Sequence, residues 1–215
     1  MRTRLGSPWV GVAAAALLLA GCGGGAEPGG SDEIAGVGEG AGAASPEASS
    51  AGDGIVRPEV SLPQGDQLVF DPRETGDART DAVLHDNAEY LRAIDEAIGH
   101  QDPGSKAVSF YSKGSAHLGS VDWIGGFVKD GTTVTGTVRY TGREVTFSED
   151  GSAGLTYCAD ESKGYTKDIK TKKTDVTPAT KDSYVFYSDR LRKNAKGVWQ
   201  TTKSTSERGS KACRP

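Results

Sequence analysis

The chain has 215 residues, of which 25% are charged, 35% are hydrophobic and 30 are glycines. These values exclude a multi-span membrane protein, a collagen and a coiled coil, and they leave room for one ordinary domain. The formal net charge of −4 is unevenly distributed, because residues 22–76 carry ten acids and two bases whereas residues 77–215 carry 19 acids and 21 bases. The acidic excess therefore belongs to the N-terminal part of the chain.

Residues 1–21 have the pattern of an export signal. Arg2 and Arg4 precede a 12-residue apolar run from Trp9 to Ala20, which is shorter than the roughly 20 residues of a stable membrane span. The run ends in Leu-Ala-Gly-Cys, which resembles the box preceding the lipidated cysteine of bacterial lipoproteins. This resemblance implies cleavage after Gly21, diacylglyceryl and amino-terminal acyl groups on Cys22, and a lipid anchor on the outer face of the cell membrane. An ordinary signal peptide followed by a chance cysteine is the alternative.

Two cysteines remain once Cys22 is assigned to the lipid. Cys158 and Cys213 lie in a chain that we expect to be exported, and an oxidising compartment permits disulfides. We therefore predict a structural disulfide that joins a strand in the middle of the domain to the C-terminal segment. A redox-active pair is the weaker interpretation, because the Cys-x-x-Cys spacing is absent.

A tether follows the predicted anchor. Residues 23–54 contain eleven glycines and seven alanines without apolar periodicity, so they cannot bury enough surface to offset the entropy of ordering. We predict a flexible tether over residues 22–54, reaching about 30 Å on average. Residues 55–76 hold three prolines and a few apolar residues, which predicts an extended arm packed on a folded domain of residues 77–215.

The first part of this domain has helical periodicity. Between Asp77 and His100, apolar residues recur at steps of three and four, and the acids Asp86, Glu89, Asp95 and Glu96 are expected on the opposite, solvated side. Weaker patterns predict helices over residues 105–111 and 115–128, the latter interrupted by Gly125 and Gly126.

Strand patterns follow from Thr132 onward. Apolar alternation predicts strands over residues 132–140, where Gly142 is expected to end the first, and then over 145–148, 155–160, 184–192 and 198–206. Helices followed by antiparallel strands predict an α+β domain with its helices packed on one face of the sheet.

The order of these features is similar to that of a family of actinobacterial surface lipoproteins. The features are the lipoprotein box, the tether, a long first helix containing Tyr90, the Tyr157-Cys158-Ala159-Asp160 step, and Trp199 before a near-terminal Cys213. The resemblance covers residues 77–213 and implies the curved-sheet cone of the cystatin-like and nuclear transport factor 2-like superfamily. It also implies that Cys158 pairs with Cys213 and that Trp199 lies in a late strand. Members of this superfamily include isomerases, cyclases, dehydratases and plain binding modules, so the fold alone does not define the activity.

Candidate pocket residues are few. An enzyme on this scaffold would place an acid/base pair inside the cone, and the pocket or rim candidates are Trp123, Asp122, Tyr140, Tyr165 and His117. Core packing explains the aromatic residues about as well. The other two histidines are expected to be a packing residue, His85, and a helix-end cation, His100. No catalytic motif is present, and the His and Cys residues lack the spacing of metal ligands, so we predict neither a metal nor a cofactor.

Positive charge accumulates toward the C-terminus. Residues 163–214 carry fourteen bases and five acids. This excess could attract anionic headgroups or wall polymers, although lysines on exposed strand edges also serve only to prevent strand pairing. The candidate contacts are Lys167, Lys170, Lys172, Lys173, Arg190 and Arg192.

The sequence thus predicts a lipid-anchored, non-enzymatic module that binds a small ligand or an envelope protein. An isomerase-like or cyclase-like enzyme that uses the cone interior is the first alternative. A basic-face module that contacts the cell envelope is the second. Nucleic acid is not an expected partner, because export separates the protein from it.

Overall fold

A computed structural model describes residues 54–215. The predicted signal peptide, Cys22 and nearly all of the predicted tether lie outside the described residues. Within residues 54–215, no helix is both long and apolar enough to cross a membrane.

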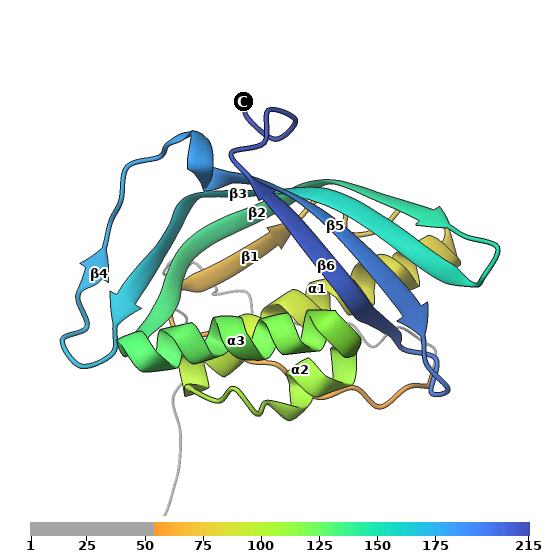
Figure 1. Cartoon of the computed structure of the whole chain (residues 1–215), viewed down its shortest axis with the longest axis horizontal. Helices are drawn as coiled ribbons and strands as arrows, with labels where there is room; N and C mark the ends of the chain where they lie inside the picture. The colour runs from red at the N-terminus through yellow and green to blue at the C-terminus, as the bar shows by residue number, and fades with distance from the viewer. Residues whose placement is uncertain (1–53) are drawn as a thin grey trace, which may run out of the picture. The chain divides into compact units, whose positions relative to one another are not determined.

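Three helices lie in the first half of the domain (Figure 1): α1 spans Ala78–His100, α2 spans Lys106–Tyr111 and α3 spans Gly114–Asp130. Helix α1 begins where the Asp77 carboxylate accepts a hydrogen bond from the Thr80 backbone amide at 2.8 Å, as expected of an N-cap. It ends at Gln101, which adopts a left-handed conformation with φ 56°. All three predicted helices are confirmed, and Gly125 and Gly126 do not interrupt α3.

The second half of the domain supplies most of an open sheet. The strands are β1 (Asp66–Phe70), β2 (Thr132–Phe147), β3 (Ser152–Asp168), β4 (Thr174–Asp175), β5 (Tyr184–Lys193) and β6 (Trp199–Arg208), and the short helix η1 (Lys181–Ser183) precedes β5. Their order is β1-β2-β3-β5-β6, with β4 paired to β3. Only the β1–β2 pairing is parallel. The helices pack on one face of this sheet (Figure 1), which confirms the predicted α+β class; we call this the inner face.

The predicted strand boundaries need three changes, one of which is that the strand predicted over residues 155–160 is the longer β3, with which the unpredicted β4 pairs. Gly142 does not end a strand but lies at φ 60° in a register shift between Thr141 and Glu144, inside the continuous strand β2. A glycine that adopts a left-handed conformation within a ladder is typical of a β-bulge, which bends a strand without ending it. The predicted arm, residues 55–76, contains β1, which forms an edge of the sheet.

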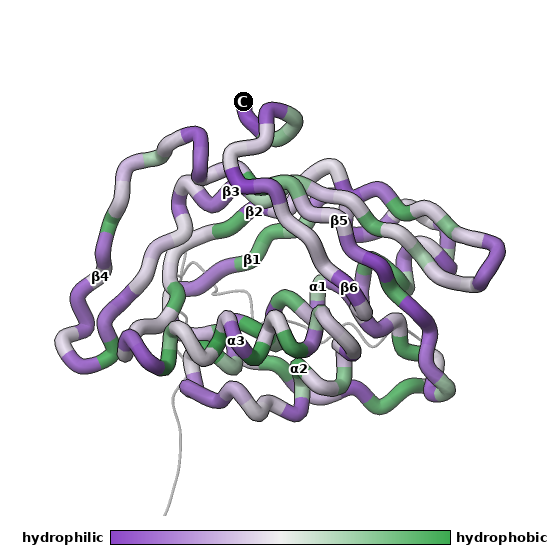
Figure 2. Tube along the Cα trace, in the orientation of Figure 1, coloured by the Kyte–Doolittle hydropathy of each residue, from purple (hydrophilic) through white to green (hydrophobic). Residues whose placement is uncertain are grey.

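The core has two parts that meet at α1. Val83, Leu84 and Ala88 of this helix pack against inner-face residues such as Leu155 and Trp199. Farther along α1, Ala93 and Ile98 pack against α2 and α3. Apolar residues are concentrated in the helices and in the middle of the strands, whereas the excursion that carries β4 is largely hydrophilic (Figure 2).

Residues 54–65, which we call the strap, pack against a side of α1 that was expected to face solvent. The Arg57 Nε donates to Asp86 Oδ1 at 3.1 Å, and the Trp199 backbone amide donates to Asp86 Oδ2 at 2.8 Å. The Ser61 amide donates to Glu96 Oε1 at 2.7 Å. Asp86 is fully buried, so its predicted place on a solvated helix face is wrong. The strap and the start of β6 cover the side of α1 that the periodicity had left to solvent.

Candidate functional site

Four aromatic rings form a row across the inner face of the sheet, one each from β1, β2, β3 and β5. Phe70 stacks on Tyr140 with 4.9 Å between ring centroids. Tyr140 meets Tyr157 edge-on at 5.9 Å, and Tyr157 stacks on Tyr187 at 5.1 Å. Side chains on one face of neighbouring strands stack in this way when the registers align. The row therefore gives the inner face an apolar floor whose tyrosine hydroxyls are the polar groups.

A pair of carboxyl groups lies beside this floor. Asp66 is the first residue of β1, and it occupies the same buried set of alternating positions as Leu68 and Phe70. The Asp66 side chain is hydrogen-bonded to Asp95 of α1. Such a bond requires that one of the two carboxyl groups be protonated. Asp66 Oδ2 is buried and has no hydrogen-bond partner among the described residues.

Burial dominates the titration of this pair. Desolvation raises the pKa of Asp66 from 3.8 to about 6, although its hydrogen bond to Asp95 opposes the shift. Desolvation, together with the neighbouring charge of Asp66, raises the pKa of Asp95 well above its usual range. Burial also raises the pKa of the Tyr140 phenol, and the charge of Asp95 adds to the effect. The pair therefore titrates as a unit, and Tyr140 stays neutral beside it.

A second polar network lies deeper on the inner face. Asp189 of β5 accepts hydrogen bonds from the Asn87 amide at 3.2 Å and from the Tyr157 hydroxyl at 3.0 Å. The Asn87 side-chain oxygen in turn accepts from the Arg143 guanidinium at 3.2 Å. Burial raises the pKa of Asp189 to about 6 and lowers the pKa of Arg143 to about 10. This network ties α1 to β2, β3 and β5.

An ion pair marks the exposed edge of the same face. The Arg208 guanidinium of β6 lies 2.7 Å from Glu161 Oε2 of β3, and both side chains are partly exposed. The charge of Glu161 contributes to the raised pKa values of Asp95, Tyr140 and Tyr187. The inner face therefore extends from a partly exposed ion pair to a buried pair of carboxyl groups.

This arrangement can donate and accept protons or hydrogen bonds. A carboxyl pair with one shared proton has a donor and acceptors within a few ångströms, and the rings beside it belong to the buried core. Across residues 54–215, no group of three or more His, Cys, Asp and Glu side chains is arranged to hold a metal ion.

The predicted pocket residues are dispersed. Tyr140 belongs to the aromatic row described above. Asp122 is exposed, and Trp123 is 57% exposed on α3, where it meets Phe127 edge-on. His117 Nδ1 lies 3.1 Å from the Ser112 hydroxyl. Tyr165 lies in β3, partly buried and opposite Thr135 of β2. Of the five candidates, Tyr140 is the one that belongs to the aromatic row.

The predicted basic contacts form two groups at opposite ends of β3. Lys167 and Lys172 line a cavity beside the C-terminal end of this strand, and Lys170 and Lys173 are exposed in the same turn. The guanidinium groups of Arg190 and Arg192 each lie 2.6 Å from Asp150 Oδ2 near the start of β3. One carboxylate therefore offsets half of the charge of the two arginines, and the six residues do not form a single continuous basic surface.

The predicted disulfide is confirmed. Cys158 is bonded to Cys213 with 5.4 Å between their Cα atoms, and Trp199 begins β6, as the resemblance implied. The bond joins the middle of β3 to the C-terminal segment.

Asp66 and Asp95 were missed as site residues. Asp95 was expected on the solvated side of α1, but the structure places it against Asp66. A signal for Asp66 was available, because it continues the alternation of Leu68 and Phe70 toward the buried face. No local signal marks Asp95.

Comparison with known proteins gives limited help. No protein-family model matches the chain, and no curated protein matches it. A ketosteroid isomerase-like protein from Erwinia carotovora atroseptica is 18% identical, with 62% of this chain and 98% of that chain covered and a TM-score of 0.42. A putative ketosteroid isomerase from Shewanella frigidimarina is 12% identical, with coverages of 65% and 100% and a TM-score of 0.33. The intermembrane space region of the chloroplast protein ARC6 is 16% identical, with coverages of 63% and 99% and a TM-score of 0.38. Identities and scores this low transfer no activity to the chain.

Proposed function

We propose that this protein is exported and lipid-anchored, and that its domain binds a small ligand on the inner face of the sheet. The observation that carries the proposal is the carboxyl pair Asp66–Asp95 beside Tyr140. Burying two carboxyl groups costs free energy that a purely structural contact could avoid with apolar side chains. Perturbed carboxyl groups of this kind concentrate at functional sites.

The chemistry of the pair indicates the kind of ligand. The shared proton can be donated to a carbonyl or hydroxyl oxygen, and the remaining carboxylate oxygens can accept from a hydroxyl or an amine. The stacked rings of Phe70 and Tyr140 favour a ligand with a flat or apolar body. We therefore expect a small neutral or cationic molecule, because the neighbouring Glu161 disfavours an anion.

An acid–base enzyme is the second candidate function, and the pKa of about 6 for Asp66 favours it. A general base is most effective when its pKa lies near the working pH. In an enzyme, the pair would move a proton on the bound molecule and release a changed product. In a binding module, the molecule would be released unchanged.

Native mass spectrometry of the full chain, isolated from the envelope of its own host, tests the ligand. We expect a discrete small-molecule adduct on the wild-type protein that is lost in Asp66→Asn. The exposed neighbour Asp71→Asn is the matched control and should retain the adduct. Bare protein in all three samples, or an adduct that survives Asp66→Asn, would remove the inner face as the binding site. Incubating the released molecule with fresh protein then separates binding from turnover.

The anchor is tested separately. Labelled palmitate should be incorporated into the wild-type chain and not into Cys22→Ala, which should be released or left as an uncleaved precursor. Continued labelling of the variant would overturn the lipid anchor but would not affect the proposal for the inner face.

A further inference from the structure

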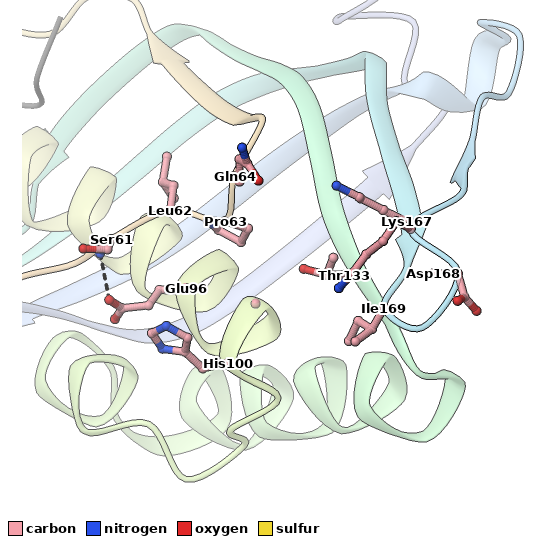
Figure 3. A pocket seen from close by; sticks show the side chains of 12 residues that line it. Ser61, Leu62, Pro63, Gln64, Glu96, His100, Thr133, Lys167, Asp168 and Ile169 are labelled. Carbon is pink, nitrogen blue, oxygen red and sulfur yellow. Dashed lines mark hydrogen bonds between the residues drawn. The ribbon is translucent and has the colours of Figure 1, made fainter. Parts of the chain in front are cut away.

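A cavity of ≈390 Å³ lies between the strap, the C-terminal end of α1, the start of β2 and the end of β3 (Figure 3). The residues that line it include neither member of the carboxyl pair and none of the four stacked rings. Its volume falls within the range of small-molecule sites. It is therefore a second candidate site, and the ligand that it could bind does not depend on the residues of the inner face.

One wall of the cavity carries two free cations. Lys167 near the end of β3 and Lys172 in the following turn both line the cavity. Among the described residues, neither ammonium group is hydrogen-bonded or ion-paired to another side chain. Two uncompensated ammonium groups on the wall of one cavity attract an anion.

The carboxylates of the cavity already accept hydrogen bonds from backbone amides. Glu96 on the opposite wall accepts the Ser61 amide at 2.7 Å (Figure 3). Asp168 Oδ1 accepts from the Lys170 amide at 3.0 Å and from the Thr171 amide at 2.6 Å. The amide and hydroxyl of Thr171 hold the pKa of Asp168 below its usual value, and its side chain points away from the wall formed by α1 (Figure 3). Neither carboxylate is paired with a lysine of the cavity.

The hydroxyl of Thr133 gives an independent indication of a missing partner. Thr133 lies opposite Lys167 on the neighbouring strand β2 and lines the same cavity. Its oxygen is buried and has no hydrogen-bond partner. Buried hydroxyls in folded proteins are almost always hydrogen-bonded, so an acceptor supplied by a ligand would complete this one.

The turn that follows Lys167 and carries Lys172 is held in place by backbone hydrogen bonds. The Lys172 amide donates to the Asp168 carbonyl at 2.9 Å, the Asp168 amide to the Lys173 carbonyl at 2.9 Å, and the Ile169 amide to the Gly131 carbonyl at 3.0 Å. Lys172 itself adopts a left-handed conformation with φ 61°, which few non-glycine residues do. A turn held by this many bonds presents its lysines with little loss of backbone entropy on binding.

We infer that this cavity binds a phosphate ester. The ammonium groups of Lys167 and Lys172 and the hydroxyl of Thr133 supply donors for several phosphate oxygens, and lysine is a common phosphate ligand. Leu62, Pro63 and Ile169 offer apolar contacts to the organic part. A free organic phosphate and the headgroup of an anionic phospholipid share this chemistry.

The chain from residue 22 onward, with Cys22→Ala so that it carries no lipid, allows a direct test. Glycerol 3-phosphate is titrated against the protein and backbone amide shifts are followed by NMR. We expect saturable shifts at Thr133, Lys167 and Ile169, with a dissociation constant in the range of about 10 μM to 10 mM. Lys167→Gln combined with Lys172→Asn should weaken binding at least about tenfold, because each lysine contributes a charge-assisted bond. Asparagine tolerates the left-handed conformation at position 172.

A matched control lies in the same turn. Lys170→Gln combined with Lys173→Gln removes the same charge from residues that do not line the cavity, so its affinity should stay within about twofold of the wild type. Shifts that do not saturate, or equal weakening in the two double variants, would overturn the site and leave only general attraction of anions to a basic turn.

Flotation with vesicles of phosphatidylglycerol and phosphatidylcholine identifies the source of the phosphate. If the cavity variant loses vesicle binding and glycerol 3-phosphate competes with the vesicles, the ligand is a lipid headgroup. If vesicle binding is the same in all variants while the NMR titration remains sensitive to the cavity variant, the ligand is a free phosphate ester. Both outcomes support the site, and neither depends on the carboxyl pair.

Discussion

The carboxyl group of Asp66 on the edge strand β1 shares a hydrogen bond with that of Asp95 on α1. The bond joins an edge of the sheet to the helix that covers the sheet, and burial raises the pKa of both carboxyl groups. Stability should therefore depend on pH in a direction opposite to that of ordinary salt-bridged carboxylates.

The sign follows from the pKa of Asp66, which rises from 3.8 to about 6 on folding. Burial makes the folded protein bind the proton of Asp66 more tightly than the unfolded chain does, so this contribution to stability is complete below pH 4 and is lost as the pH rises through 6, while the hydrogen bond to Asp95 partly offsets the loss. The loss should be no more than about 3 kcal/mol for a shift of this size. Urea unfolding of the full chain between pH 4 and 7.5 measures it.

Asp66→Asn should flatten this slope, whereas exposed Asp71→Asn should leave it unchanged. Asp189, whose pKa is also raised to about 6, contributes in the same range, so part of the slope should persist in the Asp66 variant. An unaltered slope in Asp66→Asn would mean that the pKa of Asp66 is not raised in the folded protein.

The bond between Cys158 and Cys213 spans a sequence separation of 55 residues. In the chain-entropy description, closing such a loop stabilises the folded state by about 4 kcal/mol. Replacing both cysteines with alanine should lower the urea midpoint accordingly, and the wild type in reductant should behave like the variant. Two alkylatable thiols in the folded, untreated protein would contradict the disulfide.

Arg57 and Asp86 form an ion pair between the strap and α1, with side-chain exposures of 10% and 0%. Removing one member of a buried pair leaves the other charge without compensation, so Arg57→Ala should cost about 3 kcal/mol of unfolding free energy. Glu89→Gln, which breaks the partly exposed pair with Arg92, is the comparison and should cost less than about 1 kcal/mol. Equal losses in the two variants would show that Arg57 contributes no more than a surface charge.

The sequence predicted the elements better than the site. The periodicity of α1 and the alternation in β3 and β5 can be seen within a short stretch of sequence. Each pattern arises because one face of the element is buried. Asp86 and Asp95 were placed on the solvated side because the periodicity assumes that only one side of α1 is covered. Helix α1 instead packs against the sheet, against α2 and α3, and against the strap, so carboxyl groups on several of its sides are buried. The partners that make these positions polar, Asp66 and Arg57, come from a segment whose pairing with β2 and α1 is not local.

The predicted set of basic contacts also failed because the sequence does not show how distant residues are arranged in space. Lys167 lies near the C-terminal end of β3, whereas Arg190 of β5 pairs in register with Gly154 near the start of β3, where it contacts Asp150. Charge counts along a chain do not contain this information. The orphan hydroxyl of Thr133 becomes visible only when the structure shows which polar atoms lack partners.

Two glycines of β2 should respond very differently to alanine. Both adopt left-handed conformations, with φ 93° at Gly136 and 60° at Gly142, and this alone should cost about 1 to 2 kcal/mol. A Cβ atom at Gly142 would meet nothing within 4 Å, whereas one at Gly136 would lie 2.1 Å from the Lys163 carbonyl oxygen. Gly136→Ala should therefore be at least about 2 kcal/mol less stable than Gly142→Ala in urea.

Gly136→Ala and Gly142→Ala should also differ in their effect on the carboxyl pair. Gly136 pairs in register with Asp66, and its amide donates to the Gly65 carbonyl at 2.8 Å. Displacing β2 from β3 at this point moves the strand that holds Asp66, so Gly136→Ala should also reduce the pH dependence of stability. Gly142→Ala should preserve that dependence. Equal stability of the two variants would mean that the β2–β3 ladder can yield at Gly136 without strain.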